Sequence, residues 1–341
     1  MTGKRRYWGL LFPSDAATMT QVAQGCEAAG LEGIWAVQLY GPPFLPLAAA
    51  AMVTKRVKLG SGVALAFTRS PLETALCAID VDTMSGGRMV LGLGTSIRWW
   101  NESWHGVAYG KPIAHLREVV RMVREIIAGA HGGKLGKIAG EYHKLDLKGF
   151  STMAPPVRNR IPIYLPAVFE NAVRLAGEIA DGLPGHPIWS VRWIENEVQE
   201  NLEASLKQAG RKRSEFDLNV WAFVTIDEDR KRAINDARAT VAFYSSMAQY
   251  EKYFAAHRFG AEARAACAAA QRGDQAATVA AIPDEMVTTF AVAGTPDEVR
   301  ARVEKLWQRA DSMTLAPPAV GLDAGSIARH QAAIAKMFYT A

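Results

Sequence analysis

The sequence predicts an α/β fold in which one chain of 341 residues forms a (β/α)8 TIM barrel. Short apolar runs that end in Gly or Pro alternate along the chain with longer segments of helical periodicity. A doubly wound open sheet is the rival architecture, and it would carry a Gly-rich GxGxxG turn after its first strand. Here the first apolar run ends in Phe12-Pro13-Ser14-Asp15, so the barrel is favoured.

Eight segments have the length and apolar content of barrel strands. We expect them at residues 7–12, 33–38, 57–66, 89–94, 161–165, 181–185, 218–226 and 313–316. Helical patterns lie between and after them. We expect these helices at residues 18–29, 45–53, 71–84, 112–128, 170–179, 190–209, 228–250, 296–309 and 324–338.

Two insertions interrupt this alternation. Residues near 130–160 contain many Gly and Lys, and the polar/apolar alternation at 142–147 predicts a small hairpin outside the repeating layer. Residues near 250–290 are rich in Ala and helical in pattern, which predicts a helical insertion that is either packed on the rim or a lid. Because no composition shift marks a boundary, we expect a single domain over residues 1–341.

Composition excludes several classes of protein. The formal charge of +5 is mild, and no run of Lys and Arg exceeds three residues, so we do not expect nucleic-acid binding. No apolar stretch reaches the length of a membrane span, and no signal peptide is recognisable. The three cysteines form no CxxC motif, which favours free thiols in a reducing compartment. We therefore expect a cytoplasmic protein.

In a barrel the active site lies at the carboxyl ends of the strands. The predicted ends carry no Asp, Glu or Lys, and His186 is the only titratable side chain among them. The seven histidines are scattered, without HxH or HExxH spacing, so we expect no metal site. A cofactor is therefore expected to bring the chemistry, while the protein supplies shape and hydrogen bonds.

Glycines at the third and fourth strands agree with a cofactor site. They lie in GSGV at residues 60–63 and in GLGT at residues 92–95. Glycine lets a backbone approach a flat ligand closely, and the loop Gly94-Thr95-Ser96 can direct peptide N–H groups and two hydroxyls at a phosphate. Each glycine alone is better explained by a tight turn, so the argument depends on their joint positions.

Several motifs resemble one known family. They are VKLGSGV at 57–63, TRSP at 68–71, MSGGRMVLGLGT at 84–95, LAGEIADG at 175–182 and VAGTPDEV at 292–299. The chain resembles the luciferase-like monooxygenase superfamily over roughly residues 7–240 and 285–320. Within it, the sequence is most similar to coenzyme F420-dependent oxidoreductases of the methylenetetrahydromethanopterin reductase-like group.

The resemblance implies a cofactor across the strand ends, F420 or alternatively FMN. It implies a non-proline cis peptide at Gly62–Val63, which would press the backbone against the reactive ring. The implied cofactor-binding residues are Phe12, Gln38, Gly62, Val63, Ala64, Gly94, Thr95, Ser96, Ala167, Val168, Gly185 and His186. We expect Tyr40, Trp99 and Trp100 to contact the substrate. The start of the helix at 170 would favour an anion, although Glu170 would oppose it.

The sequence departs from the family at the second strand. Deazaflavin-dependent alcohol and sugar-phosphate dehydrogenases of this superfamily place an Asp-His pair there, whereas this chain has Gln38 and Leu39. A related Glu after the fourth strand is replaced by Ile97. No catalytic residue is therefore assigned, and the aromatic surroundings predict a largely apolar substrate.

Three functions remain open from the sequence. The first is an F420-dependent oxidoreductase that transfers a hydride between the deazaflavin and a largely apolar small molecule. The second is an FMN-dependent two-component monooxygenase, and the third is a non-catalytic flavin-binding barrel. The resemblance also implies a homo-oligomer, for which the dimer is common in the family. Neither the substrate nor the direction of hydride transfer follows from the residues.

Overall fold

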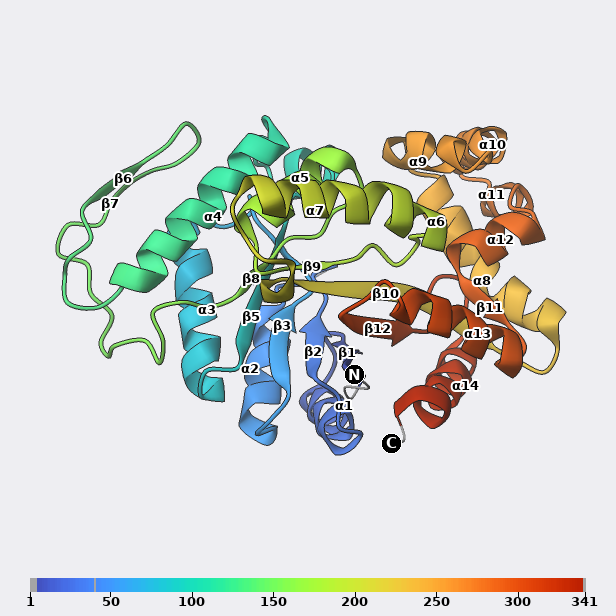
Figure 1. The fold of residues 1–341 in the computed structure, drawn as a ribbon, viewed down its shortest axis with the longest axis horizontal. Helices are drawn as coiled ribbons and strands as arrows, with labels where there is room; N and C mark the ends of the chain where they lie inside the picture. Colours follow the sequence, from blue (N-terminus) through green and yellow to red (C-terminus); the bar gives the residue numbers. More distant parts are fainter. Residues whose placement is uncertain (1–4, 40, 340–341) are drawn as a thin grey trace. The chain divides into compact units, whose positions relative to one another are not determined.

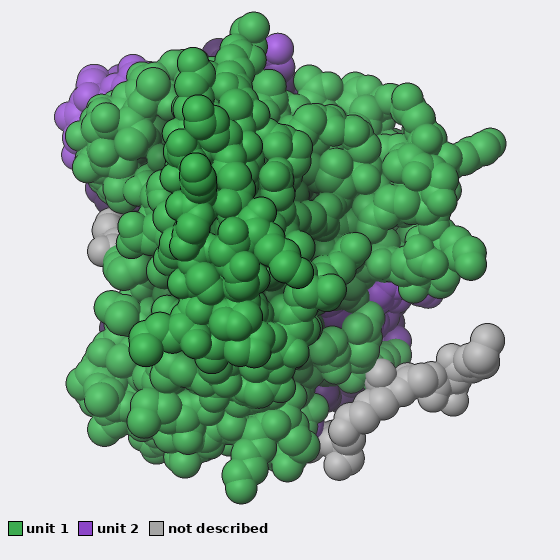
Figure 2. Space-filling model, turned by 90° about the vertical axis from the view of Figure 1, so that its left-hand side faces the viewer, with its two compact units in different colours: residues 1–185, 196–219 green, residues 186–195, 220–341 purple. Residues whose placement is uncertain are grey.

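The structure is a computed structural model that describes residues 5–39 and 41–339. The chain divides into two compact units. Unit 1 comprises residues 1–185 and 196–219, and unit 2 comprises residues 186–195 and 220–341, coloured green and purple in Figure 2. The expectation of a single domain over residues 1–341 stays a prediction.

Unit 1 alternates parallel strands with helices. Each strand pairs in parallel with the next of the series β1 (Tyr7–Leu11), β2 (Gly33–Ala36), β3 (Lys58–Ser61), β5 (Met89–Gly94), β8 (Ile163–Tyr164) and β9 (Gly182–Pro184). The start of β10 (Asp217–Ile226) pairs with β9. The helices are α1 (Ala16–Ala28), α2 (Phe44–Val53), α3 (Pro71–Ser85), α4 (Pro112–Gly129), α5 (Glu170–Ile179) and α7 (Glu200–Gln208) (Figure 1).

Unit 2 continues the alternation. The later part of β10 pairs in parallel with β11 (Val292–Gly294), and β12 (Ser312–Ala316) follows next in the chain. The helices are α6 (Val191–Trp193), α8 (Arg230–Ser245), α9 (Glu251–Ala256), α10 (Gly260–Gln271), α11 (Gln275–Ala280), α12 (Asp284–Phe290), α13 (Pro296–Trp307) and α14 (Ala324–Ile334). The π-helical segment Ile194–Gln199 joins α6 to α7. The order of strands and helices along the chain is the predicted (β/α)8 order.

Both predicted insertions are confirmed. Residues 137–146 form the antiparallel hairpin β6 (Lys137–Ala139) and β7 (Lys144–Asp146) (Figure 1). Its turn is fixed to α4 because the Glu118 carboxylate accepts hydrogen bonds from the backbone N–H groups of residues 141–143. Residues 250–290 contain α9 to α12, so this insertion is helical as expected.

The predicted third strand is interrupted, which corrects the expected single strand at 57–66. It forms β3 and a separate β4 (Ala64–Leu65), and both pair with β5. Gly60 lies opposite Val90, whereas Ala64 lies opposite Leu93. Three residues therefore separate the paired positions on this strand, against two on β5. One extra residue of this kind is a β-bulge, which bends a strand and redirects its side chains.

The sequence analysis also did not predict the strand β11, because its three residues directly precede the strong start signal of the next helix. The capping of that helix, α13, is confirmed. Pro296 occupies its first turn, and Thr295 and Glu298 form a capping box in which the Thr295 N–H donates to Glu298 Oε2 at 3.0 Å.

Large aromatic rings fill the core of unit 1 by lying over glycines on the next strand. The paired positions are Trp8 with Gly33, Trp35 with Gly60, and Tyr164 with Gly182. A Cβ at any of these glycines would lie 2.2–2.5 Å from the ring. Trp8 and Trp35 are fully buried and stack with ring centroids 4.1 Å apart. Gly60 is therefore explained by core packing.

Over the residues that the structure describes, no helix has both the length and the apolar character needed to cross a membrane.

Candidate active site

Gln38 follows β2 and organises the segment after β3. Its side chain is buried, and Oε1 accepts hydrogen bonds from the Leu65 N–H at 3.0 Å and from Arg69 Nη1 at 3.2 Å. Arg69 also lies 5.4 Å from the Phe44 ring centroid. The amide oxygen of Gln38 is thus committed to the protein, and only the remaining part of its amide group can contact a ligand.

The strand-three residues and the β5 glycines lie against one another. The Gly62–Val63 peptide is cis. Ser61 Oγ donates to the Gly92 carbonyl at 2.8 Å and accepts from the Gly92 N–H at 2.9 Å. A Cβ at Gly94 would lie 2.6 Å from Val63 Cγ2, so Gly94 provides the space that Val63 occupies. The structure thus brings together Gly62, Val63 and Gly94, with Ala64 buried beside them.

In the loop after β5, the carbonyls accept hydrogen bonds from side chains of the protein, whereas the N–H groups do not donate to any described residue. Asn101 is fully buried, and its Nδ2 donates to the carbonyls of Thr95 and Ile97 at 2.9 Å. Tyr109 donates its hydroxyl to the Ser96 carbonyl at 2.9 Å. No described residue accepts a hydrogen bond from the N–H groups of residues 95–97.

The backbone of this loop has the conformation of an anion-binding turn. Ser96 adopts a positive φ of 55°. Consecutive N–H groups around a left-handed residue form a concave donor site for anions. Sequence reasoning singled out Thr95 and Ser96, but it missed Asn101 and Tyr109, which orient the loop from a short helical turn and from the approach to α4.

Ala167 and Gly185 form an isolated parallel bridge at the ends of β8 and β9. The Gly185 N–H donates to the Asn219 carbonyl at 2.7 Å, so it is not available to a ligand. Val168 lies beside Ala167, close to the start of α5, where the first N–H groups have no intrahelical acceptor. Glu170 forms an ion pair with Arg174 at 2.9 Å, which weakens its expected opposition to an anion.

His186 follows Gly185 directly and belongs to unit 2. Its Nε2 lies 3.0 Å from the Tyr250 hydroxyl, and its ring packs edge-on against Tyr244. Burial lowers the pKa of His186 to about 3, because the charged imidazolium would lose its hydration. His186 is therefore neutral at physiological pH and can only exchange hydrogen bonds.

Three tryptophans cluster in the loop between β5 and α4. Residues 100–104 form a short π-helical segment, which sequence reasoning did not anticipate. Trp104 stacks on Trp100 with centroids 5.0 Å apart and meets Trp99 edge-on at 5.2 Å. Trp99 is 56% exposed and Trp104 48% exposed. Exposed indoles that support one another offer a ready apolar surface to a ligand.

Two further residues of the predicted site, Phe12 and Tyr40, lie at or beyond the end of strands β1 and β2 in the sequence. Phe12 is 50% exposed at the end of β1, and Tyr40 lies outside the described residues. Arg88 donates to the carbonyls of Ala51 and Thr54 at the end of α2 and to that of Val57, so its guanidinium has a structural role. No group of three or more His, Cys, Asp or Glu side chains that could hold a metal occurs in residues 5–39 and 41–339.

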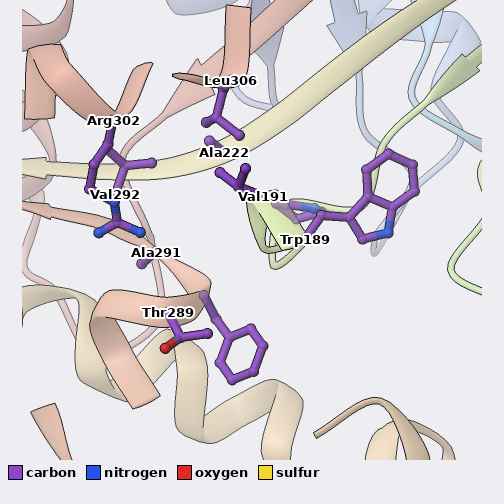
Figure 3. A pocket seen from close by; sticks show the side chains of 10 residues that line it. Trp189, Val191, Ala222, Thr289, Ala291, Val292, Arg302 and Leu306 are labelled. Atoms are coloured by element: carbon purple, nitrogen blue, oxygen red, sulfur yellow. The ribbon is translucent and has the colours of Figure 1, made fainter. Parts of the chain in front are cut away.

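Unit 2 contains a cavity that sequence reasoning did not identify (Figure 3). Its wall is mostly apolar and consists of Pro187, Trp189, Val191, Ala222, Thr289, Phe290, Ala291, Val292, Arg302 and Leu306. Apart from the indole N–H of Trp189, the only polar or charged side-chain groups on this wall belong to Thr289 and Arg302. Figure 3 shows the Arg302 guanidinium extending from α13 toward Ala291 and Thr289.

Comparison with known proteins identifies the family. The family model described as "Luciferase-like monooxygenase" matches residues 6–311. A 5,10-methylenetetrahydromethanopterin reductase of Archaeoglobus fulgidus is 31% identical, over 87% of this chain and 88% of that protein. A putative coenzyme F420-dependent oxidoreductase of Mycobacterium tuberculosis is also 31% identical, over 89% of this chain and 90% of that protein.

A solved structure supports the same assignment at the level of the fold. The coenzyme F420-dependent tetrahydromethanopterin reductase of Methanopyrus kandleri has a TM-score of 0.79, with 24% identity and coverage of 98% of both chains. The predicted (β/α)8 barrel is thereby confirmed. The chain belongs to the luciferase-like monooxygenase family, and the expectation of an enzyme is confirmed over that of a non-catalytic barrel.

Proposed function

We propose that the protein is an F420-dependent oxidoreductase that transfers a hydride between the deazaflavin and a largely apolar small molecule. The observation that carries the proposal is the loop at residues 95–97. Its carbonyls accept hydrogen bonds from Asn101 and Tyr109, while its N–H groups have no acceptor within the described part of the chain. A loop of this polarity favours an anionic group, such as the phosphate of the cofactor's side chain.

The residues present fit a flat cofactor with an anionic tail. Gly62, Val63 and Ala64 supply backbone and small side chains beside Gly94, and the atoms nearest to a Cβ at Gly94 belong to the apolar side chains of Val63 and Pro166. Thr95 and Ser96 add hydroxyls to the N–H donors. Phe12, Gln38, Ala167, Val168, Gly185 and His186 complete the proposed set of cofactor-binding residues. When bound, the deazaflavin supplies or accepts the hydride.

The chain's own contribution would be binding and orientation. The unit 1 strand ends carry no carboxylate or ammonium group, so this part of the site offers no obvious proton donor. His186 is neutral because of its lowered pKa, and it can stabilise polar atoms by hydrogen bonding. Such a site suits a substrate carbon that accepts a hydride without general acid catalysis from the unit 1 strand ends.

The proposed substrate surface is the tryptophan cluster in the loop after β5. Trp99 and Trp100 are the expected contacts, and Trp104 supports both rings. Tyr40 is proposed for the same surface from the sequence alone. With F420 bound, Trp99→Ala should raise KM for an apolar acceptor and leave F420 affinity unchanged, whereas an equal loss of F420 affinity would place Trp99 at the cofactor instead.

The decisive experiment is a titration of the purified protein with F420 and, separately, with FMN. We expect saturable F420 binding at lower concentration than FMN. Tight FMN binding without F420 affinity would reject the proposal and favour the monooxygenase alternative, which oxygen uptake with supplied reduced FMN would then test.

A matched pair of variants tests the role of the loop. Asn101→Ala removes two hydrogen bonds to the loop carbonyls, and we expect F420 affinity to fall roughly tenfold because the donors lose their orientation. Asn201→Ala is the control, since Asn201 on α7 also makes two hydrogen bonds: it donates to the Glu197 carbonyl and accepts from Arg174 Nε on α5. Equal F420 affinity in both variants would remove the loop from the cofactor site.

A further inference from the structure

The guanidinium of Arg302 is the feature of unit 2 that the proposed function leaves unexplained. Arg302 lies on α13 and forms part of the wall of the cavity shown in Figure 3. Within the described residues, no side chain or carbonyl forms a hydrogen bond or ion pair with it. Arg302 is partly buried, and charged groups that lose part of their hydration are commonly paired.

The nearby charges do not neutralise Arg302. Burial lowers the pKa of Arg302 to about 10, and the attraction of Glu298 only partly offsets this effect. The Glu298 carboxylate is already engaged, because Oε1 accepts from Arg230 Nε at 2.9 Å and Oε2 accepts from the Thr295 N–H at 3.0 Å. Arg230 adds a second positive charge, which further disfavours the cationic form of Arg302.

One further polar group of a cavity-wall residue lacks a hydrogen-bond partner within the described residues. The indole N–H of Trp189 is buried and has no hydrogen-bond acceptor among the described residues. The Thr289 hydroxyl donates to the Glu285 carbonyl at 2.8 Å, so its hydrogen is not available for a hydrogen bond to a ligand. No Asp or Glu lies on the wall. The cavity therefore combines an unpaired cation with an apolar surface.

We propose that this cavity binds a small monovalent carboxylate whose carboxylate pairs with Arg302 and whose short apolar part packs against Trp189, Phe290 and Leu306. A carboxylate matches the planar fork of a guanidinium and can accept two parallel hydrogen bonds. One unpaired arginine balances one negative charge, so a monoanion is compensated while a dianion is not. The apolar wall favours a hydrocarbon tail over inorganic anions.

The test is isothermal titration calorimetry of the full chain with sodium propionate, sodium formate, sodium chloride and sodium sulfate at matched ionic strength. Propionate should bind saturably and more tightly than formate, by about fourfold for each methylene that is buried. Chloride and sulfate should give no saturable heat. Absence of saturable propionate binding, or equal affinity for sulfate, would overturn the proposal.

Arg302→Met and Arg300→Met form a matched pair on α13. Arg300 is exposed and forms an ion pair with Asp297, so its substitution removes the same charge from the helix surface. Propionate affinity should fall at least about tenfold in Arg302→Met and stay unchanged in Arg300→Met. Equal affinity in the two variants would show that the carboxylate binds elsewhere.

A conservative variant keeps the test informative if Arg302→Met does not fold. Arg302→Lys retains the charge without the planar fork, and it should weaken propionate binding less than Arg302→Met while leaving chloride ineffective. A propionate affinity in Arg302→Lys equal to that of the wild type would refute the bidentate pairing. The proposal does not depend on F420, since every measurement uses the protein without added cofactor.

Discussion

Substitution of Gly60 by alanine tests the packing of aromatic rings over glycines in unit 1. An added Cβ would lie 2.2 Å from Trp35 Cε3. Carbon atoms in contact prefer a separation of at least about 3.5 Å, so the ring or the strand must move by about 1.3 Å. Trp35 has little room to move, because Trp8 stacks on it at 4.1 Å and Tyr164 lies 5.7 Å away. Overpacking of this kind costs about 1–3 kcal/mol.

The assay is urea denaturation followed by tryptophan fluorescence, with Gly25→Ala as the control. Gly25 lies on the exposed face of α1, and no atom lies within 4 Å of its added Cβ. Alanine is a better helix former than glycine, so this variant should gain about 0.5–1 kcal/mol. The two substitutions should therefore shift the midpoint in opposite directions. A Gly60→Ala midpoint at or above that of the wild type would refute the packing argument.

Three further predictions follow from contacts in unit 1. Burial lowers the pKa values of His115 and His143, whose Nε2 atoms lie 2.9 Å apart, below the ordinary value of about 6.5; the unfolded chain then binds more protons, so stability should fall as pH drops below that value. Denaturation midpoints at pH 7.5 and 5.5 should differ less in His143→Gln than in the wild type. The control His105→Gln, at an exposed site, should keep the wild-type difference, and identical profiles for the two variants would contradict the role of the His115–His143 pair. Gln38→Leu should cost about 1–3 kcal/mol in chemical denaturation because the buried Leu65 N–H loses its acceptor, whereas Gln38→Glu should retain most of the stability, and equal losses would argue against that bond. Arg88→Met should destabilise the chain by roughly 1–3 kcal/mol without changing F420 affinity, and the reverse pattern would make Arg88 a cofactor ligand.

Local signals were enough to place most elements of the fold. The helix expected at 296–309 is α13 (Pro296–Trp307), because a capping threonine, a proline and a glutamate occur at fixed spacing. The helix expected at 71–84 is α3 (Pro71–Ser85), where Ser70 caps the start and Gly86 ends it in the left-handed conformation. In both helices the determining contacts lie within four residues.

The errors concern contacts between residues that are distant in the sequence. Gly60 was grouped with the glycines that favour a cofactor site, although its space is filled by Trp35 from the neighbouring strand. Arg302 has the spacing of an ordinary helix surface residue, and only the folded chain shows that it lacks a partner. Asn101 was missed for the same reason, since its role depends on the path of the loop that it holds.

Several expectations stay predictions. They are the proposed cofactor-binding and substrate residues, the homo-oligomer, the cytoplasmic location and the possible role of residues 250–290 as a lid. A measurement of molar mass in solution would decide the oligomer.

The extra residue between β3 and β4 limits how the length of this segment can vary. A surface loop usually accepts an inserted or deleted residue. Here both flanks are fixed, because Gly60 is paired with Val90 and Ala64 with Leu93 on the same strand. Removing one residue would leave two residues between the paired positions on each strand. The side chains and N–H groups that remain between Gly60 and Ala64 would then point to the opposite faces of the sheet. The length of this segment is thus constrained as well as its sequence. Relatives that share this site should therefore differ here by substitutions and not by insertions or deletions.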